Sequence, residues 1–124
     1  MKRRTEGTTT QKEVKITYNK LVRDKVPEII KASGKTAETR ILSDPEYESM
    51  LKAKLLEECK EYTEASGRDS QIEEMADIYE VLNTLAERKN ITLEEVVAAA
   101  ERKRESRGGF SAKIMLQAVT EQSI

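Results

Sequence analysis

The chain has 124 residues, of which 36% are charged, and its net charge at pH 7 is −1. This balance argues against a protein that coats nucleic acid or binds membranes through a polybasic surface, because both need a large excess of positive charge. The absence of histidine excludes a Ser-His-Asp triad, a histidine-ligated zinc and the Glu-x-x-His di-iron site of carboxylate four-helix proteins.

The polar residues 1–13 show no hydrophobic periodicity, which predicts a flexible N-terminal segment. The remainder, residues 14–124, has the length of a single domain. Leu, Ile, Val and Phe make up only about 21% of the chain, and there is no tryptophan, so one copy alone would have a thin hydrophobic core. We therefore expect a homo-oligomer, either a dimer or a tetramer.

A single cysteine, Cys59, rules out an intramolecular disulfide and is typical of a reducing compartment. Cys59 falls inside a helical pattern, so we expect a small packed residue, with a reactive thiol as the alternative. No apolar run reaches membrane-spanning length, and the N-terminus lacks the apolar stretch of a signal peptide. These features predict a cytoplasmic protein that binds no membrane.

Short segments are expected before and after the main helices. Apolar residues alternate over 14–18, which predicts an extended segment, and residues 37–42 have a similar pattern. Between them, Pro27 would open a brief helix that Gly34 closes. The tail, with apolar residues over 110–116, is expected to run extended against the body of the protein.

Three long helices are predicted between these segments, over about residues 45–65, 70–89 and 93–107. Asp44 would be the N-cap of the first helix, with Pro45 at its first position. Thr92 and Glu95 have the spacing of a capping box at the start of the third helix. The pattern predicts an all-α protein, a helical bundle with short extended flanking segments.

The first long helix carries acidic residues within its apolar face. At about 100° per residue, Glu58 lies inside this face, Glu61 at its margin and Glu57 slightly further round. The apolar members of the face are Tyr47, Leu51, Leu55, Cys59, Tyr62 and Ala65.

The second long helix repeats this feature, because Glu74 lies within its apolar face and Asp77 at the margin. The connection between the two helices is short, so they should form an antiparallel hairpin. The four acids Glu58, Glu61, Glu74 and Asp77 would then lie within about one helical turn, roughly 5 Å, along the axis.

Carboxylates that are desolvated together repel one another unless they protonate or bind a cation. Mg²⁺ suits a site built only from oxygen atoms. The alternative is a solvated acidic face, paired with Lys54 or Lys60, in a chain rich in glutamate.

The segments Glu57-Glu58-Cys59-Lys60-Glu61 and Glu74-Met75-Ala76-Asp77 resemble the E-E-x-x-E, spacer, E-x-x-D signature of the all-α nucleoside triphosphate pyrophosphohydrolases. This is the MazG and phosphoribosyl-ATP pyrophosphohydrolase-like superfamily. Residues 18–30 resemble the opening of the phosphoribosyl-ATP pyrophosphohydrolase-like branch, and residues 107–110 resemble its close. The resemblance covers about residues 18–116.

The resemblance implies a hydrolase that splits a nucleoside triphosphate, or a related nucleotide, between the α and β phosphates. It implies that the Mg²⁺ ligands, with Mn²⁺ as a substitute, are Glu58, Glu61, Glu74 and Asp77. It leaves Glu57 or Glu61 to activate the attacking water, and it also implies dimers or higher oligomers.

Positive charge must meet the pyrophosphate part of such a substrate. The candidates near the two ends of the chain are Lys20, Arg23, Lys25, Lys103, Arg104 and Arg107. The last three would also be favoured simply as cations at a helix C-terminus.

Two other functions stay open at this point. One is a catalytically inactive helical dimerisation or adaptor module, in which a buried acid without a metal would lower stability. The other is a helix-turn-helix DNA reader using residues 92–107, which Glu94, Glu95 and the negative net charge disfavour. The substrate base is not specified by the sequence, and house-cleaning of nucleotide pools is one interpretation.

Overall fold

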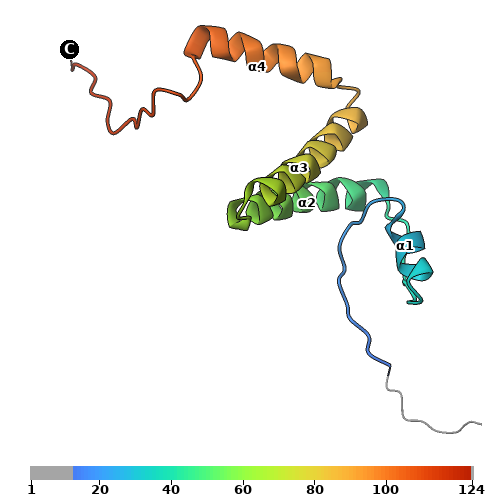
Figure 1. The fold of residues 1–124 in the computed structure, drawn as a ribbon. Helices are drawn as coiled ribbons and strands as arrows, with labels where there is room; N and C mark the ends of the chain where they lie inside the picture. The colour runs from blue at the N-terminus through green and yellow to red at the C-terminus, as the bar shows by residue number, and fades with distance from the viewer. Residues whose placement is uncertain (1–12, 124) are drawn as a thin grey trace, which may run out of the picture. The chain divides into compact units, whose positions relative to one another are not determined.

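The structure is a computed structural model that describes residues 13–123. Within this range the elements are four helices and no strand (Figure 1), namely α1 (Val26–Ala32), α2 (Asp44–Glu64), α3 (Arg68–Arg88) and α4 (Leu93–Arg107). The predicted all-α class is confirmed. The predicted N-terminal segment, apart from Glu13, lies outside the described residues.

The chain divides into two compact units, residues 1–54 and 55–124, and the boundary falls inside α2. The first unit contains α1 and the start of α2, whereas the second contains the rest of α2 together with α3 and α4. The expectation of one domain over residues 14–124 stays a prediction.

In the first unit, the helix predicted to open at Pro27 is α1. Pro27 stands in its first turn, where no intrahelical N–H bond is lost. Just after the C-terminus, Gly34 has φ +88°, a conformation that glycine adopts without strain. The segments 14–18 and 37–42 are irregular and mostly exposed, and an ion pair of 3.2 Å joins Lys15 and Glu38 across them.

The N-cap of α2 is Ser43, and the expected assignment to Asp44 was wrong by one residue. The Glu46 N–H donates to Ser43 Oγ at 3.4 Å, and the Ser43 N–H donates to Glu46 Oε1 at 3.2 Å. This reciprocal pairing satisfies backbone donors that the first helical turn leaves without partners. Arg40 donates two further hydrogen bonds to the Glu46 carboxylate, at 2.8 and 3.2 Å.

The predicted capping box of α4 is confirmed. The Glu95 N–H donates to Thr92 Oγ1 at 3.1 Å, and the Thr92 N–H donates to Glu95 Oε2 at 3.2 Å. The helix ends at Arg107, where Gly108 takes φ +85°. Capping thus fixes the start of α4, although none of its residues is buried.

The hydrophobic core of the described chain is small, as the composition predicted. Its buried apolar residues are Leu51, Val81 and Ala86. The expectation that Cys59 packs in the core was wrong, because this side chain is exposed. The apolar residues of the tail, 110–123, are also exposed within the described part of the chain, contrary to the expected packing against the body.

No helix of residues 13–123 combines the length and the apolar character that crossing a bilayer requires.

The Arg40–Glu46 pair predicts a pH dependence of stability. The pKa of Glu46 is lowered to about 2, first by the hydrogen bonds from Arg40 and then by those from Ser43. A carboxyl whose pKa falls on folding stabilises the fold above its unfolded pKa, and this contribution is lost as the pH falls from about 4.5 to about 2. In denaturant unfolding experiments, the free energy of unfolding of Glu46→Gln should therefore fall less with decreasing pH than that of the native protein.

The matched control is Glu64→Gln, which removes a carboxylate from the other end of α2. Its free energy of unfolding should depend on pH as that of the native protein does. Identical acid profiles for the native protein and Glu46→Gln would contradict this account of the helix start.

Candidate metal centre

Two neighbouring helical segments of the second unit present acidic side chains. The second half of α2 carries Glu57, Glu58 and Glu61, and the first half of α3 carries Glu74 and Asp77. Residues three or four apart lie on one face of a helix, so each segment offers its acids to one side. Residues 65–67 reverse the chain, and Gly67 has φ +90° at the start of α3.

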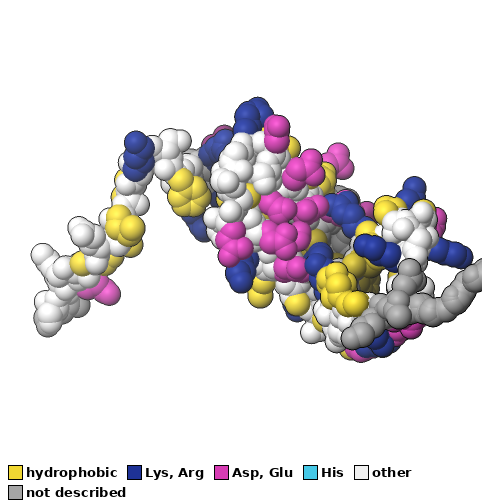
Figure 2. Space-filling view, turned by 60° about the horizontal axis from the view of Figure 1, so that its bottom comes forward, with side chains coloured by type: hydrophobic (Ala, Val, Ile, Leu, Met, Phe, Trp, Pro, Cys, Tyr) yellow, Lys and Arg dark blue, Asp and Glu magenta, His cyan; other side chains and the backbone are white. Residues whose placement is uncertain are grey.

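The reversal brings the acids of the two helices together. Carboxylate oxygens of Glu58, Glu74 and Asp77 lie within 4.8 Å of one another, and so do those of Glu57, Glu58 and Glu61. Glu58 belongs to both groups and therefore joins them into one acidic cluster of five residues. Figure 2 shows acidic side chains gathered on one face of the molecule.

The five side chains of the cluster differ in their exposure to solvent, from buried to exposed. Glu58 is only 4% exposed, Glu57, Glu74 and Asp77 are half-buried, and Glu61 is exposed. A carboxylate at the depth of Glu58 has lost most of its hydration, so its charge needs compensation from its surroundings. The exposed margin at Glu61 leaves the cluster open to solvent on one side.

The surroundings of Glu74 in the cluster raise its pKa above the ordinary value. Loss of hydration is the largest cause, followed by the negative charges of Glu61 and Asp77 and a hydrogen bond with Glu61. The Glu61–Glu74 hydrogen bond joins α2 to α3 within the cluster. Without a cation, the arrangement favours keeping a proton on Glu74.

The donor set fits a hard divalent cation. All five side chains offer oxygen atoms, which are the ligands that Mg²⁺ prefers, and the cysteine next to Glu58 is exposed. Mg²⁺ binds oxygen at about 2.1 Å, so ligands on opposite sides of the ion lie about 4 Å apart. Oxygens within 4.8 Å of one another need only small side-chain rotations to reach that spacing.

The structure brings together the five acids that the sequence predicted, and their roles as ligands or as a base stay predictions. No other acid or cysteine among residues 13–123 joins either group.

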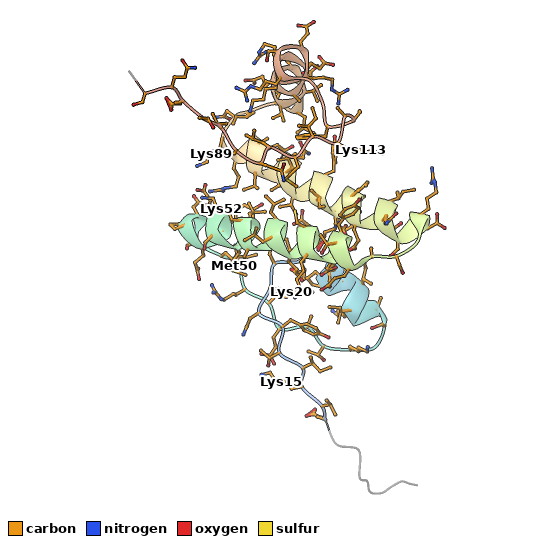
Figure 3. The ribbon with its side chains drawn as sticks, turned by 90° about the vertical axis from the view of Figure 1, so that its left-hand side faces the viewer. Lys15, Lys20, Met50, Lys52, Lys89 and Lys113 are labelled. Carbon is orange, nitrogen blue, oxygen red and sulfur yellow. The ribbon has the colours of Figure 1, made fainter. Side chains whose placement is uncertain are left out.

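The six predicted basic residues come from both units of the chain. Lys20, Arg23 and Lys25 precede α1 in the first unit, where Lys20 Nζ lies 5.9 Å from the centre of the Tyr18 ring (Figure 3). In the second unit, α4 carries Lys103, Arg104 and Arg107 near its C-terminus. All six are exposed, and their contact with a substrate stays a prediction.

The sequence profile of the family described as phosphoribosyl-ATP pyrophosphohydrolase matches residues 23–104, about two thirds of the chain. The matched range contains the whole acidic cluster. It also contains four of the six basic candidates and leaves out Lys20 and Arg107.

A protein of Mycolicibacterium smegmatis, described only as uncharacterized, is 53% identical over 53 residues. The aligned part covers 43% of this chain and 54% of the relative, so the chain spans about half the length of that protein. No solved structure matches the chain.

The raised pKa of Glu74, caused first by loss of hydration and then by neighbouring negative charges, predicts that neutralising this side chain stabilises the metal-free protein. A carboxyl with a raised folded-state pKa contributes stability at low pH, and this contribution is lost as the pH rises through the raised pKa. In the presence of a chelator, Glu74→Gln should therefore have a larger free energy of unfolding than the native protein at neutral pH. The difference should shrink below about pH 4, where the carboxyl is protonated in both states.

Denaturant titrations at several pH values measure this difference. Glu80→Gln, on the same helix but outside the cluster, is the control and should match the native protein throughout. A Glu74→Gln variant that is less stable than the native protein at neutral pH would contradict this account of the raised pKa.

Proposed function

The chain belongs to the phosphoribosyl-ATP pyrophosphohydrolase family, and we propose that it uses Mg²⁺ to hydrolyse a nucleoside triphosphate or a related nucleotide. The bond broken lies between the α and β phosphates, and the products are a nucleoside monophosphate and pyrophosphate. Family membership indicates a hydrolase of the nucleotide pyrophosphohydrolase type. The observation that carries the proposal for this chain is the acidic cluster shared by α2 and α3.

Four of the acids would hold the metal. Glu58 is fixed by burial, and its neighbours in the two groups supply oxygen atoms from both helices. When bound, Mg²⁺ neutralises the charge of the phosphate oxygens and makes water more acidic. The ligands that we propose are Glu58, Glu61, Glu74 and Asp77, and we expect Mn²⁺ to substitute for Mg²⁺.

The attacking water must lose a proton during hydrolysis, and a carboxylate near the cluster can accept it. Glu57 and Glu61 are the candidates, because each lies with Glu58 in the group contributed by α2. Glu57 is absent from the group that includes α3, so we assign it to the water and not to the metal. Glu61 is the more exposed of the two, so solvent reaches it more easily.

The leaving pyrophosphate carries several negative charges that cationic side chains stabilise. We assign this role to the exposed basic residues before α1 and at the end of α4, Lys20, Arg23, Lys25, Lys103, Arg104 and Arg107.

We further propose that the protein works in the cytoplasm as a homo-oligomer, a dimer or a tetramer, without a nucleic-acid or membrane partner. The small core supports self-association, because few apolar side chains are buried within one chain. A role in removing unwanted nucleotides from the pool is consistent with this chemistry.

The direct test is pyrophosphate release from a panel of ribo- and deoxyribonucleoside triphosphates, with Mg²⁺ and with a chelator. We expect metal-dependent release of pyrophosphate and monophosphate from at least one nucleotide. Glu74→Ala should reduce the rate of hydrolysis by at least about 100-fold, because it removes one of the carboxylates that we propose as metal ligands.

Glu80→Ala is the matched control on α3 and should keep the native rate. Inactivity of the folded native protein on every nucleotide would contradict the proposal and favour the adaptor function.

A further inference from the structure

A cavity of about 450 Å³ lies where α3 passes into α4. Its volume falls within the range of about 300–1,000 Å³ that is common for sites that bind small molecules. All of its lining residues belong to the second unit. They are Asn83 and Glu87 on α3, Asn90, Ile91 and Thr92 in the turn, and Leu93 at the start of α4.

The turn that forms one wall of the cavity is held by backbone hydrogen bonds. The Ile91 N–H donates to the Ala86 carbonyl at 2.9 Å, and the Asn90 N–H donates to the Glu87 carbonyl at 3.1 Å. Asn90 takes φ +57°, the left-handed conformation in which many helices end. Since Ala86 is buried and Thr92 is fixed by its capping box, the chain itself determines the shape of this wall.

Three polar side chains at the cavity have hydrogen-bonding capacity to spare. Within residues 13–123, the side chains of Asn83, Glu87 and Asn90 form no hydrogen bond or ion pair with another residue. The Thr92 hydroxyl, by contrast, already bonds to Glu95. An amide both donates and accepts hydrogen bonds, whereas a carboxylate only accepts them. The cavity therefore offers a ligand two donors with acceptors beside them and one negative acceptor.

These groups match a nucleobase edge with an amino group beside a ring nitrogen. The amino group can donate to the Glu87 carboxylate, and the ring nitrogen can accept from the amide of Asn83 or Asn90. Adenine and cytosine both have this edge, whereas hypoxanthine and uracil have a carbonyl and an N–H in its place. An aliphatic amine would pair with Glu87 but would leave both amides unused.

The apolar part of the lining suits the flat face of such a base. Ile91 is 41% exposed, and Leu93, also in the lining, is half-buried. A ring that covers them removes apolar surface from water, which favours binding. A base therefore uses both the polar and the apolar residues of the cavity.

The cavity suits a nucleoside without phosphates. None of its six lining residues is basic, and Glu87 would repel a phosphate. It is also separate from the acidic cluster. Asn83 is nine residues beyond Glu74 on α3, which places it about 13.5 Å further along the axis and about 180° around the helix.

We propose that this cavity is a second binding site, which takes a nucleoside whose base carries an amino group beside a ring nitrogen. Adenosine and cytidine are the simplest ligands of this class. The site is distinct from the candidate metal centre, and its ligand is bound and not hydrolysed. The inference therefore goes beyond the proposed function and does not depend on it.

The test is isothermal titration calorimetry of the full chain with four nucleosides, in the presence of a chelator. Adenosine and cytidine should bind with a Kd on the order of 0.1 mM, which is usual for a ligand of about twenty non-hydrogen atoms. Inosine and uridine, which differ from them at this edge, should bind at least about tenfold more weakly, because their N–H and carbonyl meet the wrong partners.

Two variants remove the amides that we assign to the site. Asn83→Leu keeps the side-chain size, and Asn90→Gly keeps the turn, because glycine takes φ +57° without strain. Each should weaken adenosine binding by about tenfold or more. Gln71→Leu is the matched control, since Gln71 is also a half-buried amide of α3 and lies outside the cavity, and it should bind like the native protein.

Glu74→Gln separates this site from the acidic cluster, and it should bind adenosine like the native protein. Four results would overturn the inference. They are a native protein that binds none of the nucleosides at millimolar concentration, equal binding of adenosine and inosine, binding that survives both Asn variants, and loss of adenosine binding in Glu74→Gln. No activity assay enters these results, so they are distinct from a failure of the proposed hydrolysis.

Discussion

The close placement of five carboxylates on two adjacent helices is the constraint on which the candidate site depends. Glu58 is 4% exposed and lies against acids from both helices, and Glu74 responds with a raised pKa. A fold selected only for stability would place apolar residues at these positions. Under the proposed function, a divalent cation bound by acids of both helices would neutralise this negative charge and link α2 to α3.

Few apolar side chains are available to balance that cost. Leu51, Val81 and Ala86 are the only buried hydrophobic residues among those that the structure describes. Local interactions such as helix capping therefore contribute a larger share of the stability. Reciprocal capping fixes the starts of α2 and α4. The hairpin of α2 and α3 therefore carries the acidic cluster, whose oxygen atoms suit a divalent cation, on helices that bury few apolar side chains.

The helices and the acidic cluster could be predicted from the sequence because they depend on local rules. The capping box of Thr92 marks a helix start directly, and the short link after α2 places acids at matching heights. The exposure of Cys59 could not be predicted, because periodicity identifies an apolar face and does not say which neighbour covers it. The cap at Ser43 was predictable, since Ser43 and Glu46 have the same spacing as Thr92 and Glu95. The placement of the basic residues against the substrate depends on contacts between distant segments, which local patterns do not encode.

Mn²⁺ binding followed by electron paramagnetic resonance tests the central claim, that α2 and α3 together form one cation site. The native protein should bind Mn²⁺, and Glu58→Gln on α2 and Glu74→Gln on α3 should each weaken binding by at least about tenfold, whereas Glu80→Gln should not. Native binding that survives either cluster variant unchanged, or no binding by the native protein, would contradict a site shared between the two helices.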